Sequence, residues 1–187
     1  MEESKAPPWY LVLDVDGTLV AETGDDTTLP KPRPHLQEFL QFAFKNFEKV
    51  AVWSAASPQW INPIVEKVIK PPQPFHFVWV NICVTRQARA SRECYGTVDV
   101  VKPLRKLTKK FPEYAEHNTL ILDDTPSTYK QNYGNAIGIS SYTGGEDDTE
   151  LLKVMEWITQ WKEEYHQTGT IRHIHKYARR TFKGKSS

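Results

Sequence analysis

The stretch that most constrains the fold of this chain is residues 9–20, which read W-Y-L-V-L-D-V-D-G-T-L-V. Its apolar start runs directly into two carboxylates, Asp14 and Asp16, and then into Gly17 and Thr18. A continuous apolar run bounded by turn residues is typical of a strand buried on both faces of a parallel sheet. Because residues i and i+2 of a strand point the same way, we expect Asp14 and Asp16 to share one site. On this segment alone, an ordinary strand that ends in a polar turn remains the simpler interpretation.

Strands and helices alternate along the remainder of the chain. Short apolar runs predict further buried strands over 49–53, 119–122 and 136–139. Apolar residues at helical spacing predict helices over 34–47, 60–69, 103–111 and 151–165, and we expect a turn-helix at 126–131. This order predicts an α/β, Rossmann-like three-layer fold with a mainly parallel sheet.

The length of 187 residues fits one domain, which we place at residues 1–165. Polar residues 21–29 suggest a small hairpin or flap, and 73–99 is interpreted as a small β-rich insert. Residues 166–187 form a basic C-terminal tail. Its last sixteen residues hold six Lys or Arg and no acid, which leaves 18 basic against 23 acidic residues elsewhere. Such a tail is an interaction signature, although a solvated terminus explains it equally well.

The composition narrows the class of protein. An apolar fraction of 39% with 12% aromatics indicates a globular chain, and no apolar run reaches the roughly 18 residues of a membrane span. The acidic, proline-bearing N-terminus lacks the apolar core of a secretory signal. Cys83 and Cys94 lack a metal-site spacing, and reduced thiols suit a cytoplasmic or nuclear protein, which we expect to be a monomer.

Polar groups follow three of the predicted strands where each one ends. In chain order these groups are Asp14 and Asp16, then Ser54, then Asp123 and Asp124. The carboxyl ends of parallel strands lie on one edge of a sheet, so these groups can converge, and Lys102 lies where it can reach the same edge. Clustered carboxylates repel one another and need a cation, and an all-oxygen site favours Mg²⁺ over Zn²⁺. The Ser54 hydroxyl and the Lys102 ammonium are donors suited to phosphate oxygens.

These groups are suited to phosphoryl transfer. A carboxylate can attack phosphorus to give an aspartyl-phosphate. A second carboxylate two residues along can protonate the leaving oxygen and then deprotonate the hydrolytic water. A magnesium ion and a lysine can offset the charge of the transferring phosphoryl group.

The motifs resemble those of the haloacid dehalogenase superfamily. D-V-D-G-T-L at 14–19 matches its first motif, and Ser54, Lys102 and the Asp123-Asp124 pair fall in the order of its next three. W-S-A-A at 53–56 and L-I-L-D-D-T-P-S at 120–127 resemble the branch of RNA polymerase II C-terminal-domain phosphatases and their small relatives. The resemblance covers roughly residues 9–160.

That likeness implies Mg²⁺-dependent hydrolysis of phosphate monoesters, with Asp14 as nucleophile and Asp16 as general acid and base. It implies that Mg²⁺ is held by the Asp14 carboxylate, the Asp16 backbone carbonyl and the Asp124 carboxylate. Asp123 would support these ligands, while Ser54, Lys102 and Thr18 would bind phosphate. The sequence shows no large cap, and an open site suits a phosphoserine or phosphothreonine protein.

The sequence departs from the pattern of that branch at several positions, and it leaves other functions possible. Gly17 stands where that branch commonly has Glu, Pro103 stands where it has Asp, and the insert is longer and divergent. Alternatives are a catalytically idle adaptor of the same fold, or a phosphatase for a small-molecule or nucleic-acid-end phosphate. Nucleic-acid binding through the basic tail is not favoured, because no reading motif accompanies it.

Overall fold

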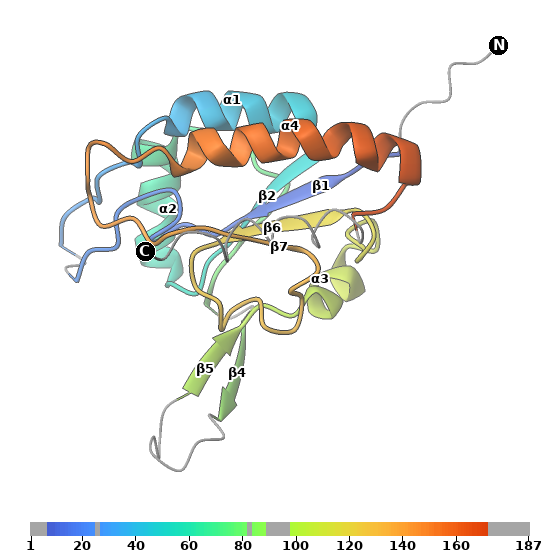
Figure 1. Cartoon of the computed structure of the whole chain (residues 1–187). Helices are drawn as coiled ribbons and strands as arrows, with labels where there is room; N and C mark the ends of the chain where they lie inside the picture. Colours follow the sequence, from blue (N-terminus) through green and yellow to red (C-terminus); the bar gives the residue numbers. More distant parts are fainter. Residues whose placement is uncertain (1–6, 25–26, 82–83, 89–97, 172–187) are drawn as a thin grey trace, which may run out of the picture.

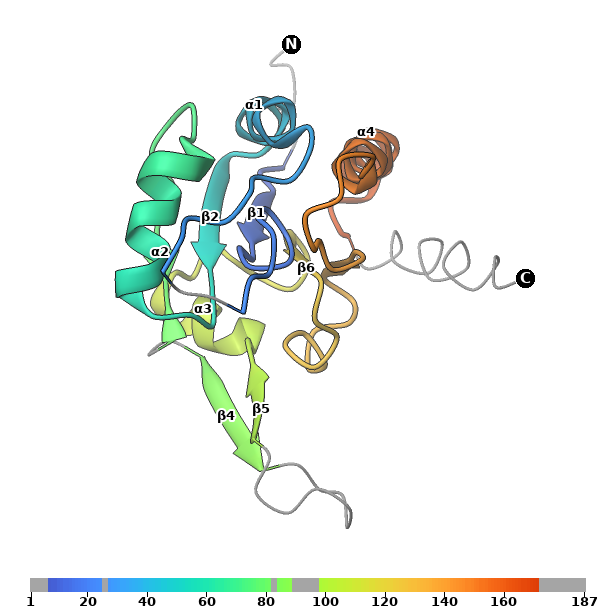
Figure 2. The same ribbon diagram turned by 90° about the vertical axis from the view of Figure 1, so that its left-hand side faces the viewer.

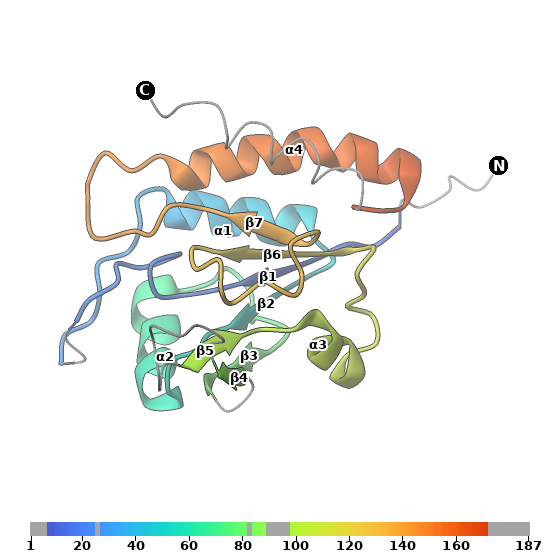
Figure 3. The same ribbon diagram turned by 60° about the horizontal axis from the view of Figure 1, so that its bottom comes forward.

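A computed structural model of the chain, which describes residues 7–24, 27–81, 84–88 and 98–171, contains a five-stranded, wholly parallel sheet. The strands lie in the order β3-β2-β1-β6-β7, as Figure 3 shows. Their bounds are β1 Tyr10–Leu13, β2 Lys49–Trp53, β3 Val78–Trp79, β6 Thr119–Asp123 and β7 Ala136–Gly138. This confirms the α/β fold class with a mainly parallel sheet.

The register of the sheet brings the ends of its three central strands level. Leu13 of β1 pairs with Val52 of β2 on one side and with Leu122 of β6 on the other. The Asp14 backbone N–H then donates to the Leu122 carbonyl at 2.9 Å. The polar residues that follow β1, β2 and β6 therefore emerge at one edge of the sheet, where such folds bind ligands.

Helices cover both faces of the sheet. Helices α1 (Leu36–Asn46) and α4 (Glu150–Thr168) lie side by side over one face, and α3 (Leu104–Lys110) lies against the other (Figures 1 and 2). Helix α2 (Pro58–Ile64) follows β2 and continues into a π-helical turn, η1 (Val65–Ile69). The three-layer arrangement follows from strands that are apolar on both sides.

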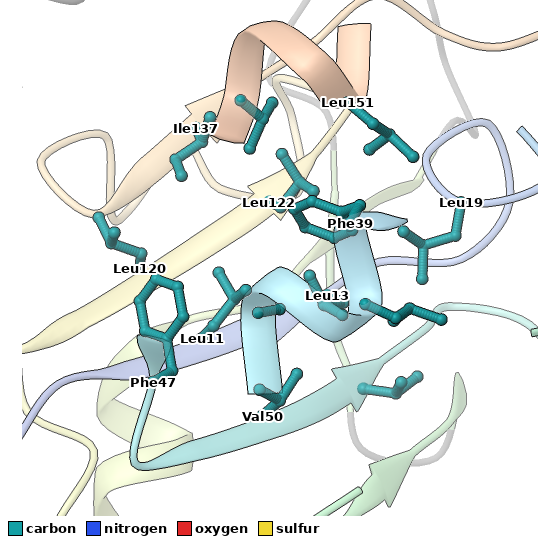
Figure 4. Close-up of a cluster of buried hydrophobic side chains, with 14 of the residues drawn as sticks. Leu11, Leu13, Leu19, Phe39, Phe47, Val50, Leu120, Leu122, Ile137 and Leu151 are labelled. Carbon is teal, nitrogen blue, oxygen red and sulfur yellow. The ribbon is translucent and has the colours of Figure 1, made fainter. Parts of the chain in front are cut away.

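Alternate residues of the central strands fill two separate cores. Leu11, Leu13 and Leu122 pack with Phe39 of α1 and Leu151 of α4 (Figure 4). The intervening strand residues face the other way, into a cluster with α3; they are Tyr10, Val12, Ala51, Trp53 and Ile121. Side chains alternate between the two faces of a strand, so a strand made only of apolar residues buries apolar side chains on both faces. Such strands hold the sheet between two layers of helices.

The expected insert at 73–99 needs a correction. Its first part contains β3, which pairs with β2 and so belongs to the main sheet. The separate element is the antiparallel pair β4 (Thr85–Ala88) and β5 (Val98–Val101), which projects away from the sheet (Figures 1 and 2). Strand β5 leads directly into Lys102 and α3, so the base of this pair adjoins the candidate site.

Two other expectations differ from the structure. Residues 126–131 form successive turns rather than a turn-helix, with bonds such as Thr128 N–H to Thr125 O at 3.0 Å. Helix α4 runs three residues past the expected boundary at 165 and presents the predicted apolar face. The basic residues at 172–187 lie outside the described part of the chain. Among the described helices, none has the length and apolarity that crossing a bilayer requires.

Candidate active site

Lys102 stands at the centre of the site and bridges two of the predicted carboxylates. Its ammonium donates to Asp14 Oδ1 at 2.5 Å and to Asp123 Oδ2 at 2.7 Å. All three side chains are buried or nearly so; the exposed fractions of the side chains are 1% for Lys102, 10% for Asp14 and 0% for Asp123. The structure therefore brings the ends of β1, β5 and β6 together through one cation.

Burial and the contacts between opposite charges together set the pKa values of this cluster. It raises the pKa of Asp14 to about 8, although the neighbouring Lys102 charge opposes the rise. Burial lowers the pKa of Lys102, but Asp14 and Asp123 together outweigh that effect and hold this pKa above its ordinary value. Lys102 is therefore charged at neutral pH, and additional positive charge near Asp14 would favour its ionised form.

Thr18 links the first carboxylate to the last. Its hydroxyl oxygen lies 3.3 Å from Asp14 Oδ2 and 3.1 Å from Asp124 Oδ1, and it also accepts from the Asp124 backbone N–H at 3.2 Å. Thr18 is fully buried. In this structure its hydroxyl serves the carboxylates, and its expected contact with phosphate stays a prediction.

The carboxylate cluster has the chemistry of a magnesium site. One oxygen from each of Asp14, Asp123 and Asp124 lies within 4.8 Å of the other two. Both oxygens of Asp123 already accept hydrogen bonds, from Lys102 and from the Thr125 N–H at 2.9 Å. The single Thr18 hydroxyl hydrogen lies between Asp14 Oδ2 and Asp124 Oδ1 and can be donated to only one of them. Asp14 and Asp124 are therefore the better placed ligands, and such oxygen donors fit a hard cation.

The Asp124 carboxyl shows the same need for a positive partner. The pKa of Asp124 lies above its ordinary value, chiefly because the group is buried. Hydrogen bonds from the Ser141 and Thr18 hydroxyls lower this pKa, and the nearby Asp123 charge raises it. The hydroxyls favour the ionised form and Asp123 disfavours it. A divalent cation between Asp14 and Asp124 would relieve this repulsion.

Asp16 turns its carboxylate to a different partner. Asp16 Oδ1 accepts a hydrogen bond from the Trp60 indole N–H at 2.7 Å. Burial raises the pKa of Asp16, and the Trp60 bond and the Lys102 charge both lower it. The Asp16 carboxyl thus lies within the electrostatic reach of Lys102 but is held by α2.

Ser54 is fixed at the end of β2 with its hydroxyl oxygen in use. Its backbone N–H donates to Trp79 O at 2.8 Å, and its Oγ accepts from the Ala56 N–H at 3.0 Å. Because the oxygen acts as an acceptor there, the hydroxyl hydrogen can be donated to another group. Ser54 is buried at the same strand edge as Asp14, and its role toward phosphate stays a prediction.

Asn132, which no sequence pattern indicates, fixes the backbone around Lys102. Its Oδ1 accepts from the Leu104 N–H at 2.8 Å and its Nδ2 donates to the Lys102 carbonyl at 2.6 Å. The Lys102 N–H in turn donates to Thr128 O at 2.7 Å. The turns between β6 and β7 therefore hold Lys102 in place. An Asn among turn residues is too common for its sequence position to signal this role.

Arg33 is the second residue that sequence reasoning missed. It is buried, and its guanidinium donates to the carbonyls of Gly17 at 3.3 Å and Thr18 at 3.1 Å. It also donates to Ser140 O at 2.9 Å and makes a two-pronged contact with Asp148, 2.8 Å on each side. Arg33 thereby ties the loop after Asp16 to the segment that leads into α4.

Comparison with known proteins finds relatives that match over most of this chain. The chain is 29% identical over 160 residues to the ubiquitin-like domain-containing CTD phosphatase 1 of Xenopus laevis, and equally so to that of Homo sapiens. Each alignment covers 80% of this chain and 48% of the relative, so the chain spans about half the length of these curated relatives.

A solved structure supports the fold alone. An uncharacterized protein from Listeria monocytogenes serotype 4b matches with a TM-score of 0.55 at 14% identity, covering 83% of this chain and 99% of that one. The family model described as NLI interacting factor-like phosphatase matches residues 9–168, a range that includes every residue of the site. The chain therefore belongs to the NLI interacting factor-like phosphatase family.

Proposed function

We propose that this protein is a Mg²⁺-dependent phosphatase that hydrolyses phosphate monoesters through an aspartyl-phosphate on Asp14. The observation that carries the proposal is the buried Lys102, which contacts Asp14 and Asp123 at once, 2.5 and 2.7 Å away. A buried lysine of this kind neutralises only part of the charge of the three clustered aspartates. A cation and a phosphate group would complete the balance.

Different residues of the chain perform the attack, the proton transfer and the binding of phosphate in the first step. Asp14 Oδ2, the oxygen that Lys102 does not hold, attacks the phosphorus, and the bond to the leaving oxygen breaks. Asp16 donates its proton to that oxygen, so the leaving group departs as a neutral alcohol. The Ser54 hydroxyl and Lys102 donate hydrogen bonds to the phosphoryl oxygens.

The second step returns the enzyme to its starting state. Asp16, now a carboxylate, takes a proton from water as the water oxygen bonds to phosphorus. The bond between Asp14 and phosphorus breaks, and inorganic phosphate leaves. Asp14, Asp124 and the Asp16 carbonyl would hold Mg²⁺, which when bound supplies positive charge that reduces repulsion between the phosphate and Asp14.

The substrate class we propose is a phosphoserine or phosphothreonine protein. The relatives named CTD phosphatase support this class, and the described part of the chain contains no large cap between the strand ends and solvent. A site without a cap can accept a phosphorylated side chain on an extended backbone. We also propose a cytoplasmic or nuclear location, which the relatives named CTD phosphatase support.

The test is hydrolysis of an aryl phosphate by the wild-type chain with Mg²⁺, with excess chelator, and by Asp14→Asn. We expect turnover only for the wild type with Mg²⁺, and a loss of at least about 10³-fold in Asp14→Asn, because the covalent route is removed. Glu146→Gln, an exposed carboxylate in the loop before α4, is the matched control and should leave turnover unchanged.

Two results would contradict the proposal. Activity that survives Asp14→Asn would show that another group attacks phosphorus. An inactive wild type between pH 5 and 8 with Mg²⁺ would instead favour the idle adaptor.

A further inference from the structure

The side chain expected to move the proton has a specific partner. Asp16 lies in the loop after β1, and its Oδ1 accepts the indole N–H of Trp60 at 2.7 Å. Both residues are half-buried, so this bond is formed where solvent is partly excluded. A hydrogen bond from a neutral donor to an ionised acceptor is shorter and stronger than one between neutral groups.

Trp60 is held firmly by the start of α2. Its backbone N–H donates to the Ser57 hydroxyl oxygen at 3.3 Å, which caps the helix, and to the Ser57 carbonyl at 3.2 Å. The next residue, Ile61, is fully buried in the main core. The segment that begins with Ser54 therefore fixes the Trp60 backbone, and the Trp60 side chain packs against the main core.

The chemistry of the indole limits what Asp16 can do. An indole N–H only donates, so it cannot take a proton from a carboxyl group or share one with it. While the bond to Trp60 stays in place, Oδ1 is occupied, and a proton on Asp16 must sit on Oδ2. The bond therefore selects one of the two oxygens and fixes the plane of the carboxyl group.

We propose that Trp60 is a positioning residue for proton transfer: it holds Asp16 by Oδ1 so that Oδ2 meets the leaving oxygen and then the water. This inference rests on the proposed function and adds a residue to it. In the first step, Oδ2 gives its proton to the leaving oxygen as the phosphorus bonds to Asp14. In the second, the ionised Oδ2 accepts a proton from water, and the bond to Asp14 breaks.

Leaving-group dependence separates positioning from packing. A strongly acidic phenol departs without a proton, so hydrolysis of dinitrophenyl phosphate needs little help from Asp16 in the first step. Phenyl phosphate releases a weak acid and needs the proton. The ratio kcat/KM reports steps up to formation of the aspartyl-phosphate, so it excludes the later role of Asp16 toward water.

The experiment measures kcat/KM for both substrates in wild type, Trp60→Phe and Trp157→Phe. In Trp60→Phe we expect a loss of about 10- to 100-fold for phenyl phosphate and of less than about 3-fold for dinitrophenyl phosphate. Asp16→Asn should show the same selectivity with a larger loss. Trp157→Phe makes the same chemical change at a half-buried tryptophan of α4 and should alter neither value.

A second variant covers the case in which Trp60→Phe folds poorly. Replacing Trp60 alone with benzothienylalanine keeps the ring shape and removes only the N–H, and it should reproduce the selective loss at an unchanged melting temperature. Equal losses for both substrates, or none, would overturn the role of Trp60 while leaving the phosphatase intact. A wild type inactive on both substrates would overturn the phosphatase itself, and the role of Trp60 with it.

Discussion

At the residue scale, Gly17 shows why the first motif has this form. Gly17 adopts φ +73°, a left-handed conformation that side chains rarely tolerate. A Cβ here would lie 2.5 Å from Asp124 Oδ2 and 2.8 Å from Ser141 Oγ. The Glu common at this position in the resembled branch therefore cannot replace Gly17 here unless Asp124, a proposed Mg²⁺ ligand, moves. The glycine at position 17 is therefore required by the close packing of Asp124 and Ser141 against it.

Asn132 carries a prediction at the same scale. Asn132→Ala removes the partners of the Leu104 N–H and the Lys102 carbonyl, so we expect it to lower the free energy of unfolding by about 1–3 kcal/mol for each orphaned group. It should also lower kcat/KM by about tenfold, because Lys102 loses the contact that positions its backbone and its ammonium then meets phosphate less well. Urea unfolding and aryl phosphate kinetics measure the two effects.

Asn135→Ala is the matched control for this prediction. Asn135 is also buried, and its Nδ2 donates to the carbonyls of Glu116 at 2.9 Å and Thr119 at 2.8 Å, away from Lys102. It should cost similar stability and leave kcat/KM nearly unchanged in a folded sample. Equal kinetic losses in the two variants would show that Asn132 has no special relation to Lys102.

At the element scale, Arg33 and Asp148 join the loop after β1 to the start of α4. Arg33 is buried and Asp148 is mostly so, with side-chain exposures of 0% and 17%. Breaking a buried pair costs about 3–5 kcal/mol in general, because it leaves one charge uncompensated. The same guanidinium holds the Gly17 and Thr18 carbonyls, so this connection supports both stability and the site.

The Asp148 carboxyl predicts how this stability depends on pH. Burial raises its pKa, but the hydrogen bonds from Arg33 and the Glu150 N–H, with the Arg33 charge, outweigh this and leave the pKa below its ordinary value. The unfolded chain therefore binds the proton first as pH falls. The stabilisation is present above pH of about 4 and is lost as pH falls through the folded-state pKa.

Asp148→Asn removes the charge but keeps one acceptor oxygen for Arg33, so the loss should be smaller than for removing the partner outright. We expect the variant to be less stable than wild type by about 1–3 kcal/mol at pH 7, and the gap to close below pH of about 4. Urea unfolding across this range measures it. Glu146→Gln removes the exposed pair with Lys31 and should change stability by less than about 1 kcal/mol at any pH. A gap in Asp148→Asn that persists unchanged at low pH would contradict the sign of this pKa shift.

At the scale of the whole molecule, the sequence predicted those features that depend on local pattern. Apolar runs such as 49–53 and the stripe of α4 located strands and helices correctly. A strand buried on both faces leaves a continuous apolar run, and a helix buried on one face leaves apolar residues at helical spacing. Sequence reasoning assigned β3 to the insert, since two residues carry no period. Trp60, Asn132 and Arg33 act through contacts with residues distant in the chain, and only the fold brings those partners together.

The most direct test of the central claim is to trap the intermediate. The wild-type chain is quenched during turnover of a phosphate monoester with Mg²⁺ and treated with borohydride, which reduces an aspartyl-phosphate to homoserine. Mass spectrometry then locates the reduced residue. We predict homoserine at position 14, only when substrate is present and never in Asp14→Asn. Turnover without reduction at position 14, or reduction at another aspartate, would contradict the account.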